Sequence, residues 1–172
     1  MDQMEKHFLT AFLILAGASS IQAQETISGF QDYQFGMSIE EIMKISPITI
    51  QEETDPETPS YDVKDVRMLG EDFSVQLTFK DERLWNINVA RMGYTVTNSF
   101  SCEADLDRAF AGMQANYGEP DTPLDKQDPM HMNACFTARD ASQACVTSFH
   151  FDVLDSCSLI VAYKAPPEGG SF

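Results

Sequence analysis

Apolar and polar residues alternate strictly in two neighbouring segments near the middle of the chain. The apolar positions are Phe73, Val75, Leu77 and Phe79 in the first segment and Trp85, Ile87 and Val89 in the second. A period of two places every second side chain on the same side of a strand. The polar connection at Asp81-Glu82 is typical of a turn. We therefore predict a β-hairpin whose apolar side faces a core.

The segment before this hairpin has the pattern of a short helix. Ser38 and Glu41 form a capping box, in which each side chain can accept a hydrogen bond from a backbone N–H of the first turn. Apolar residues follow at helical spacing, and Pro47 predicts that the helix ends near Ser46.

A loop and a third strand are predicted between this helix and the hairpin. Residues 51–59 are acidic and contain two prolines, as loops often do. Residues 61–69 predict a less regular strand. The first half of the chain should therefore form a helix followed by a three-stranded meander.

The second half of the chain predicts the same order of elements. A helix begins at Ser101, and Gly118 and Pro120 end it. Its apolar face consists of Leu106, Phe110, Met113 and Tyr117. A polar, proline-rich loop is predicted at residues 119–129. Strands are predicted at residues 133–138, 143–151 and 157–164.

These elements predict an α+β fold with helices packed on an antiparallel β-meander. Residues 24–165 are expected to form a single domain, and residues 166–172 a flexible tail. The repeated order favours two tandem helix-plus-three-strand units, with halves at residues 30–92 and 98–165. One continuous sheet without duplication is the alternative.

The N-terminus has the features of a secretory signal peptide. Residues 8–18 form an apolar run that is too short to span a bilayer, and small and polar residues follow it. Cleavage is predicted after Ala23, which makes residues 1–23 the signal peptide and leaves no membrane anchor. A buried N-terminal helix is the alternative. The expected location is periplasmic or secreted.

Four cysteines follow the signal peptide, namely Cys102, Cys135, Cys145 and Cys157. An even number in an exported protein predicts two disulfides, and the spacings match no common zinc site. If the chain turns around Asp140, Cys135 and Cys145 lie opposite each other across a hairpin. This favours the pairs Cys135–Cys145 and Cys102–Cys157, although three connectivities are possible.

The charge balance argues against nucleic acid as a partner. The 172 residues contain 11 Lys and Arg against 27 Asp and Glu, which gives a net charge of -16. No basic segment is available to neutralise phosphate groups. No cofactor motif is present either, so no cofactor is expected.

Motifs of common enzymes are absent from the sequence. A hydrolase needs a nucleophile beside a base, and after the signal peptide the imidazoles are those of His131 and His150, neither of which lies in a known motif. A non-catalytic protein is therefore expected, and an uncharacterised hydrolase is an alternative.

Met130-His131-Met132 is a weak candidate for a metal site. Thioether and imidazole ligands suit copper, above all Cu(I). Three consecutive residues converge on one ion only in a bent loop. A periplasmic copper-binding protein is therefore a second alternative, while the expectation is that no metal is bound.

The polar positions of the strands suggest a docking surface. If helices cover the apolar side of the sheet, the opposite side presents polar side chains to solvent. The candidate binding face consists of Gln76, Thr78, Asn86, Asn88, Ser148 and His150. We expect an exported protein that binds another protein or a ligand of the bacterial envelope or the extracellular space.

The phrase FGMSIEEI with its meander, residues 35–89, resembles the small periplasmic SmpA/OmlA-like outer-membrane assembly lipoproteins. The chain has no cysteine near the end of the apolar run, so it departs from that family's lipid anchor. Two such units in tandem also resemble the β-lactamase inhibitory proteins, whose related halves each pack helices on an antiparallel sheet. This resemblance implies a two-part sheet; no inhibitor motif is carried over.

Overall fold

The computed structural model describes residues 26–52, 54–95, 100–126, 131–151 and 156–167. The predicted signal peptide and most of the predicted tail lie outside these residues. The helices are α1 (Ile39–Ile45) and α2 (Phe100–Tyr117). The strands are β1 (Gly29–Phe30), β2 (Tyr33–Gln34), β3 (Ile48–Ile50), β4 (Ser60–Met68), β5 (Glu71–Lys80), β6 (Arg83–Thr95), β7 (Thr122–Asp125), β8 (Met132–Thr137), β9 (Gln143–Phe151) and β10 (Ser156–Lys164).

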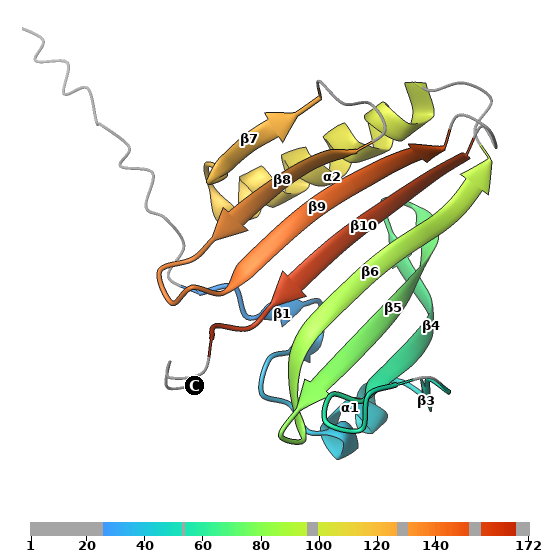
Figure 1. Cartoon of the computed structure of the whole chain (residues 1–172), viewed down its shortest axis with the longest axis vertical. Helices are drawn as coiled ribbons and strands as arrows, with labels where there is room; N and C mark the ends of the chain where they lie inside the picture. Colours follow the sequence, from blue (N-terminus) through green and yellow to red (C-terminus); the bar gives the residue numbers. More distant parts are fainter. Residues whose placement is uncertain (1–25, 53, 96–99, 127–130, 152–155, 168–172) are drawn as a thin grey trace, which may run out of the picture.

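Eight of these strands form one antiparallel sheet (Figure 1). Their order is β3-β4-β5-β6-β10-β9-β8-β7, so each half of the chain runs from an edge of the sheet to its centre. β6 and β10 pair there, with Val89 opposite Val161. α1 precedes the first four strands and α2 the second four. The α+β class with a large antiparallel sheet is confirmed.

Each half contributes four strands to this sheet, so the predicted count of three is wrong. The additional strands, β3 and β7, are short and lie at the two edges. β7 forms inside the segment that the sequence predicts as a proline-rich loop. Pro123 is compatible with an edge strand, because one side of such a strand makes no ladder hydrogen bonds.

The capping box at the start of α1 is confirmed. The Glu41 backbone N–H donates to Ser38 Oγ at 3.3 Å, and the Ser38 N–H donates to Glu41 Oε2 at 2.8 Å. The second bond, from the Ser38 backbone N–H to the carboxylate, is the main reason why the pKa of Glu41 lies below its usual value. The helix ends at Ser46, whose hydroxyl accepts a hydrogen bond from Tyr33 at 2.9 Å.

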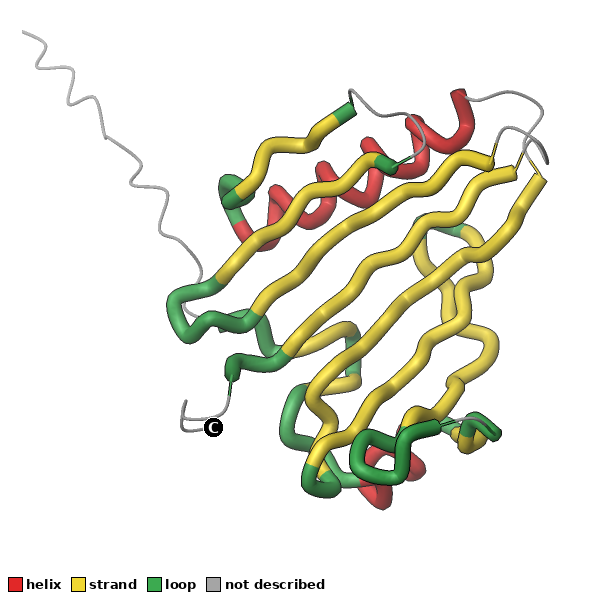
Figure 2. Tube along the Cα trace, viewed as in Figure 1, coloured by secondary structure: helices red, strands yellow, loops and turns green. Residues whose placement is uncertain are grey.

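α2 and the β1–β2 hairpin pack against one face of the sheet, which we call the covered face, and α1 lies at the lower ends of β5 and β6 (Figure 2). Ile42 of α1, Leu106 of α2 and Phe30 of β1 belong to the same buried cluster as Val75 and Leu77 of β5. The core therefore lies between the sheet and this layer.

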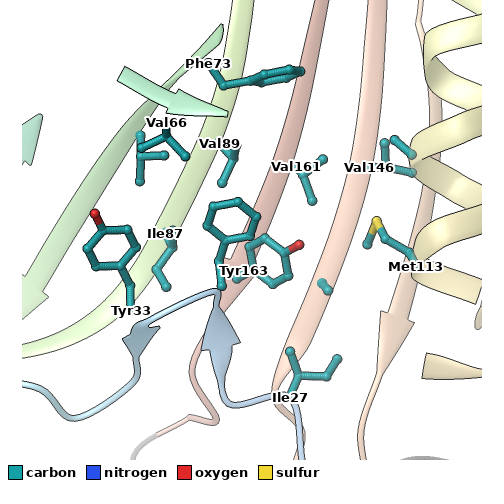
Figure 3. Close-up of a cluster of buried hydrophobic side chains, with 14 of the residues drawn as sticks. Ile27, Tyr33, Val66, Phe73, Ile87, Val89, Met113, Val146, Val161 and Tyr163 are labelled. Atoms are coloured by element: carbon teal, nitrogen blue, oxygen red, sulfur yellow. The ribbon is translucent and has the colours of Figure 1, made fainter. Parts of the chain in front are cut away.

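The β1–β2 hairpin is an element that the sequence does not predict. Phe30 packs against Tyr163, with ring centroids 5.6 Å apart. Ile27, Phe30 and Tyr33 belong to the same buried cluster as side chains of β6, β10 and α2 (Figure 3). Gly29 has φ +142°, and a Cβ atom there would lie 2.1 Å from the Tyr33 carbonyl oxygen. Only glycine fits this close approach of the two strands.

Hydrogen bonds fix the start of this segment to the β8–β9 turn. The Ile27 N–H donates to the buried Ser142 hydroxyl at 2.8 Å, and Thr26 Oγ1 donates to the Asp140 carboxylate. Desolvation alone would raise the pKa of Asp140, but the hydrogen bonds from Ser142 and Thr26 outweigh it and hold the pKa below its usual value.

The alternation in β5 and β6 is confirmed except at Trp85. Val75, Leu77, Ile87 and Val89 are buried on the covered face. A bulge follows the pair Thr78–Asn86, and it moves Leu84 rather than Trp85 into the core. Trp85 is instead half-buried, and the Lys164 ammonium lies 5.4 Å from its ring centroid. A bulge inserts one residue, which reverses the alternation before it.

Two disulfides are present, as predicted, and they join Cys102 to Cys157 and Cys135 to Cys145. The first ties α2 to the start of β10, and the second joins β8 to β9. Within the described part of the chain, neither helix combines the length and apolar character that a membrane span requires.

Candidate functional site

The second face of the sheet, which we call the open face, has no described helix or hairpin packed on it. In Figure 1, α2 lies behind β8 and β9 and β1 lies behind the end of β10, and no other element crosses the near side of these strands. Register pairs define the residues on this side. They include Ser74, Gln76, Thr78, Asn86, Asn88, Ala90, Ile160, Ala162, Lys164, Gln143, Cys145, Thr147, Asn133, Cys135 and Thr137.

A chain of side-chain hydrogen bonds crosses the first half of the open face. Asn88 Nδ2 donates to Gln76 Oε1 at 3.1 Å, and Gln76 Nε2 donates to Gln51 Oε1 at 2.8 Å. Gln51 Nε2 in turn donates to Asp62 Oδ1 at 2.8 Å. We call these four residues the amide ladder. Because each side chain is held by the next, the ladder needs little ordering when a partner binds.

The second half of the open face is less polar. The row that continues from Gln76 and Asn88 consists of Ala162, Cys145 and Cys135. Next to it, Ala90 pairs with Ile160. Toward the ends of the strands, the Phe149 ring stacks on His131 with centroids 5.0 Å apart, and Phe151 and Met92 are exposed.

Charge is absent from the middle of the open face. The residues concerned, which we call the uncharged strip, are Ser74, Gln76, Thr78, Asn86, Asn88, Ala90, Ile160, Ala162, Cys145 and Thr147. The chain nevertheless contains 27 acidic residues. Lys164 lies at one end of the strip and Asp62 at one side. Depletion of charge, with aromatic and methionine side chains nearby, is typical of the centre of a protein interface.

Two members of the predicted binding face lie on the covered face instead. Ser148 pairs with Leu159 and Met132 and is 0% exposed, and its hydroxyl has no hydrogen-bond partner among the described residues. His150 pairs with Cys157, which bonds to α2. The assignment of Ser148 and His150 to the polar side is therefore wrong. Gln76, Thr78, Asn86 and Asn88 lie together on the open face.

The physical reason for this error is the close packing of α2 on β9. The buried positions of β9 include Ala144 and Ser148, whose small side chains let the helix approach the strand. The outward positions include Cys145 and Phe149, which are apolar. The buried side of β9 therefore includes a polar residue, and the pairing of β9 with β10 is what shows which side of the sheet each residue faces.

The Met130-His131-Met132 candidate does not form a common metal site. Met130 lies outside the described residues. The exposed His131 ring stacks on Phe149, whereas Met132 is buried in the core. Neighbouring strand residues point to opposite faces, so these two ligands cannot converge. Among the described residues, no group of three His, Cys, Asp or Glu side chains could hold a metal ion.

Two clefts lie away from the open face, beside α1. One, of about 490 Å³, is lined by residues of α1 together with Glu82 and Arg83. The other, of about 530 Å³, lies between Ile39, the segment 56–59 and the β5–β6 turn. Their linings mix acidic and basic side chains, and Ser38 and Glu41 of the first cleft are engaged with each other in the capping box of α1.

An ion-pair cluster holds the first turns of α2 on the covered face. Arg91 of β6 bridges Glu71 at 3.2 Å and Asp105 at 3.6 Å, and Asp105 also pairs with Arg108. Arg91 lies 4.1 Å from the Tyr94 ring centroid. Burial, followed by the Asp105 charge, raises the pKa of Tyr94 well above its usual value. This cluster holds the first turns of α2 near the start of β10, where Cys102 of the helix bonds to Cys157.

The open face therefore offers amide donors, carbonyl acceptors and a small apolar area on a rigid sheet. Sequence reasoning missed Gln51 and Asp62, because nothing in the sequence shows that the end of β3 reaches Gln76. It also missed the apolar members of the strip. No protein-family model, no curated protein and no solved structure matches this chain.

Proposed function

We propose that this chain is an exported, non-catalytic protein that binds another protein through the open face. One observation carries the proposal: a sheet face without any described covering element has an uncharged, hydrogen-bonded centre, although the chain has a net charge of -16. A merely solvated face would not need this distribution, since acidic residues are abundant elsewhere on the surface.

The extent of the face favours a protein over a small molecule. The strip spans β5, β6, β10 and β9, and its rows of neighbouring side chains follow the sheet. Small ligands usually bind in concave pockets, whereas proteins dock on broad surfaces. The polar groups of the amide ladder can also exchange hydrogen bonds with a partner backbone or side chains at the interface.

Charges around the strip predict the chemistry of the partner. Exposed acidic residues flank both edges of the sheet, with Glu52, Asp55 and Glu57 after β3 and Glu119 and Asp121 before or at the start of β7. A partner with an uncharged centre and a basic rim complements this arrangement. A second copy of the chain, which carries the same net charge, is disfavoured by repulsion.

The export part of the proposal rests on the apolar run at residues 8–18 and on the two disulfides, which persist in oxidising compartments. The halves are also proposed to be tandem repeats, because a helix and four strands occur twice in the same order. Such an arrangement resembles the β-lactamase inhibitory proteins in outline.

A capture experiment with matched variants tests the proposal. The wild type, Asn88→Arg on the open face and Asn116→Arg on the exposed side of α2 are immobilised and exposed to the same envelope extract. Asn88→Arg should reduce capture of the wild-type partner about tenfold or more, because it places an unpaired charge in the interface centre. Asn116→Arg should bind like the wild type. Equal capture by both variants would contradict the proposal.

A further inference from the structure

The two disulfides occupy different environments. Cys102 and Cys157 are 1% and 0% exposed, and their bond joins the first turn of α2 to the start of β10. Cys135 and Cys145 are only half-buried, and both belong to the open face. Thiol–disulfide exchange requires a thiolate to reach one of the two sulfur atoms. The half-buried disulfide should therefore react faster than the buried one.

The position of Cys145 leaves one approach open. Cys135 and Cys145 are directly opposed residues of β8 and β9, with Cα atoms 4.1 Å apart. On β10, the residue beside Cys145 in the same row is Ala162. Its methyl group is too short to cover the neighbouring sulfur. A thiolate that attacks Cys145 Sγ along the row therefore approaches over Ala162, opposite the Cys135 sulfur that must leave.

We propose that Cys135–Cys145 is a thiol–disulfide exchange site that accepts electrons from a dithiol reductant, while Cys102–Cys157 is structural. In the first step, a reductant thiolate bonds to Cys145 Sγ, the S–S bond breaks and Cys135 leaves as a thiolate. In the second step, the second thiolate of the reductant attacks the reductant sulfur of the mixed disulfide. The bond between that sulfur and Cys145 Sγ breaks, and Cys145 leaves as a thiolate. The dithiol is oxidised to a disulfide by two electrons, and the protein gains two electrons and, on protonation, two protons.

The hairpin has the contacts to survive this reduction. β8 and β9 are paired from Met132–Ser148 to Thr137–Gln143, and Ala134, Phe136 and Val146 anchor them in the core. The Cys135 N–H also donates to Thr122 Oγ1 at 3.2 Å, and its carbonyl accepts from the Asp121 N–H at 2.9 Å. Cys145 and Ala162 also belong to the uncharged strip, but the experiments below measure thiol labelling and use no docking partner.

Graded reduction of the native, disulfide-bonded protein tests the proposal. The protein is incubated with limiting dithiothreitol, its free thiols are trapped with iodoacetamide, and the labelled cysteines are identified by peptide mass mapping. We expect Cys135 and Cys145 to be labelled about tenfold or more faster than Cys102 and Cys157, with an unchanged circular dichroism spectrum. Simultaneous labelling of all four, earlier labelling of Cys102 and Cys157, or loss of structure with the first pair would overturn it.

Two alanine variants test the direction of attack. Ala162→Leu places a larger side chain beside Cys145 and should slow the first labelling phase severalfold. Ala90→Leu makes the same change on the open face, on β6 and away from the disulfide, and should leave the rate as in the wild type. Equal rates in all three proteins would show that the approach over Ala162 is wrong.

Discussion

Replacing Leu77 with Asp should unfold the protein at room temperature. Leu77 is fully buried in the centre of β5, on the covered face. Shortening a buried leucine to alanine costs about 2–5 kcal/mol, and an unpaired carboxylate adds a further desolvation penalty. The sum approaches the whole stability of a domain, which is about 5–15 kcal/mol. Loss of the native circular dichroism spectrum and of a cooperative urea transition measures the effect.

Gln76→Ala is the matched control, since Gln76 is the preceding residue and lies on the open face. It removes two hydrogen bonds of the amide ladder, each worth about 1 kcal/mol. This variant should therefore remain folded. A Leu77→Asp protein with a native spectrum and an unchanged urea midpoint would mean that the two faces of β5 are wrongly assigned.

Removing the buried disulfide Cys102–Cys157 should cost more stability than removing the half-buried disulfide Cys135–Cys145. The Cys102–Cys157 bond closes a separation of 55 residues and the Cys135–Cys145 bond one of 10. Loop-closure entropy then predicts losses of about 4.2 and about 2.7 kcal/mol respectively. Double alanine variants of each pair, compared by urea unfolding, measure the two losses. The first variant also loses buried sulfur contacts beneath α2, which widens the difference.

Equal losses, or a larger loss for the half-buried pair Cys135–Cys145, would contradict the structural role of Cys102–Cys157. The two losses are compared as free energies of unfolding and not as urea midpoints, because the m-value, which reports the surface exposed on unfolding, can differ between the variants.

Local signals predicted the helices and the central strands well. The capping box of Ser38 and Glu41 fixes the start of α1 because both partners are three residues apart in the sequence. The alternation around Val75 and Leu77 shows which side of β5 is buried. These features depend on neighbouring residues, so a single sequence contains the information they require.

Features that depend on distant residues were not predictable in the same way. β3 and β7 form only because a neighbouring strand supplies their partners, and the β1–β2 hairpin exists in contact with the core. The bulge that turns Trp85 out of the core has no marker in the local sequence. Ser148 is buried because α2 packs closely on β9, which polarity alone does not show.

The candidate site was predicted in part for the same reason. Gln76 and Asn88 follow from alternation within their own strands. Their hydrogen-bond connection to Gln51 and Asp62 depends on how β3, β4, β5 and β6 are aligned. Which residues of β9 lie on the open face depends on the register of β9 against β10. Without that register, Ser148 and His150 were assigned to the wrong side of the sheet.

The side-chain amide resonances of the open face provide the most direct measurement of the central claim. The ¹⁵N-labelled protein is titrated with the partner isolated by wild-type capture, and the NH₂ signals of Gln76, Asn88 and Asn116 are followed by NMR. Binding at the open face predicts that the Gln76 and Asn88 signals shift while Asn116, on α2, stays in place. A shift of Asn116 with unchanged Gln76 and Asn88 would place the partner on the helical side and contradict the account.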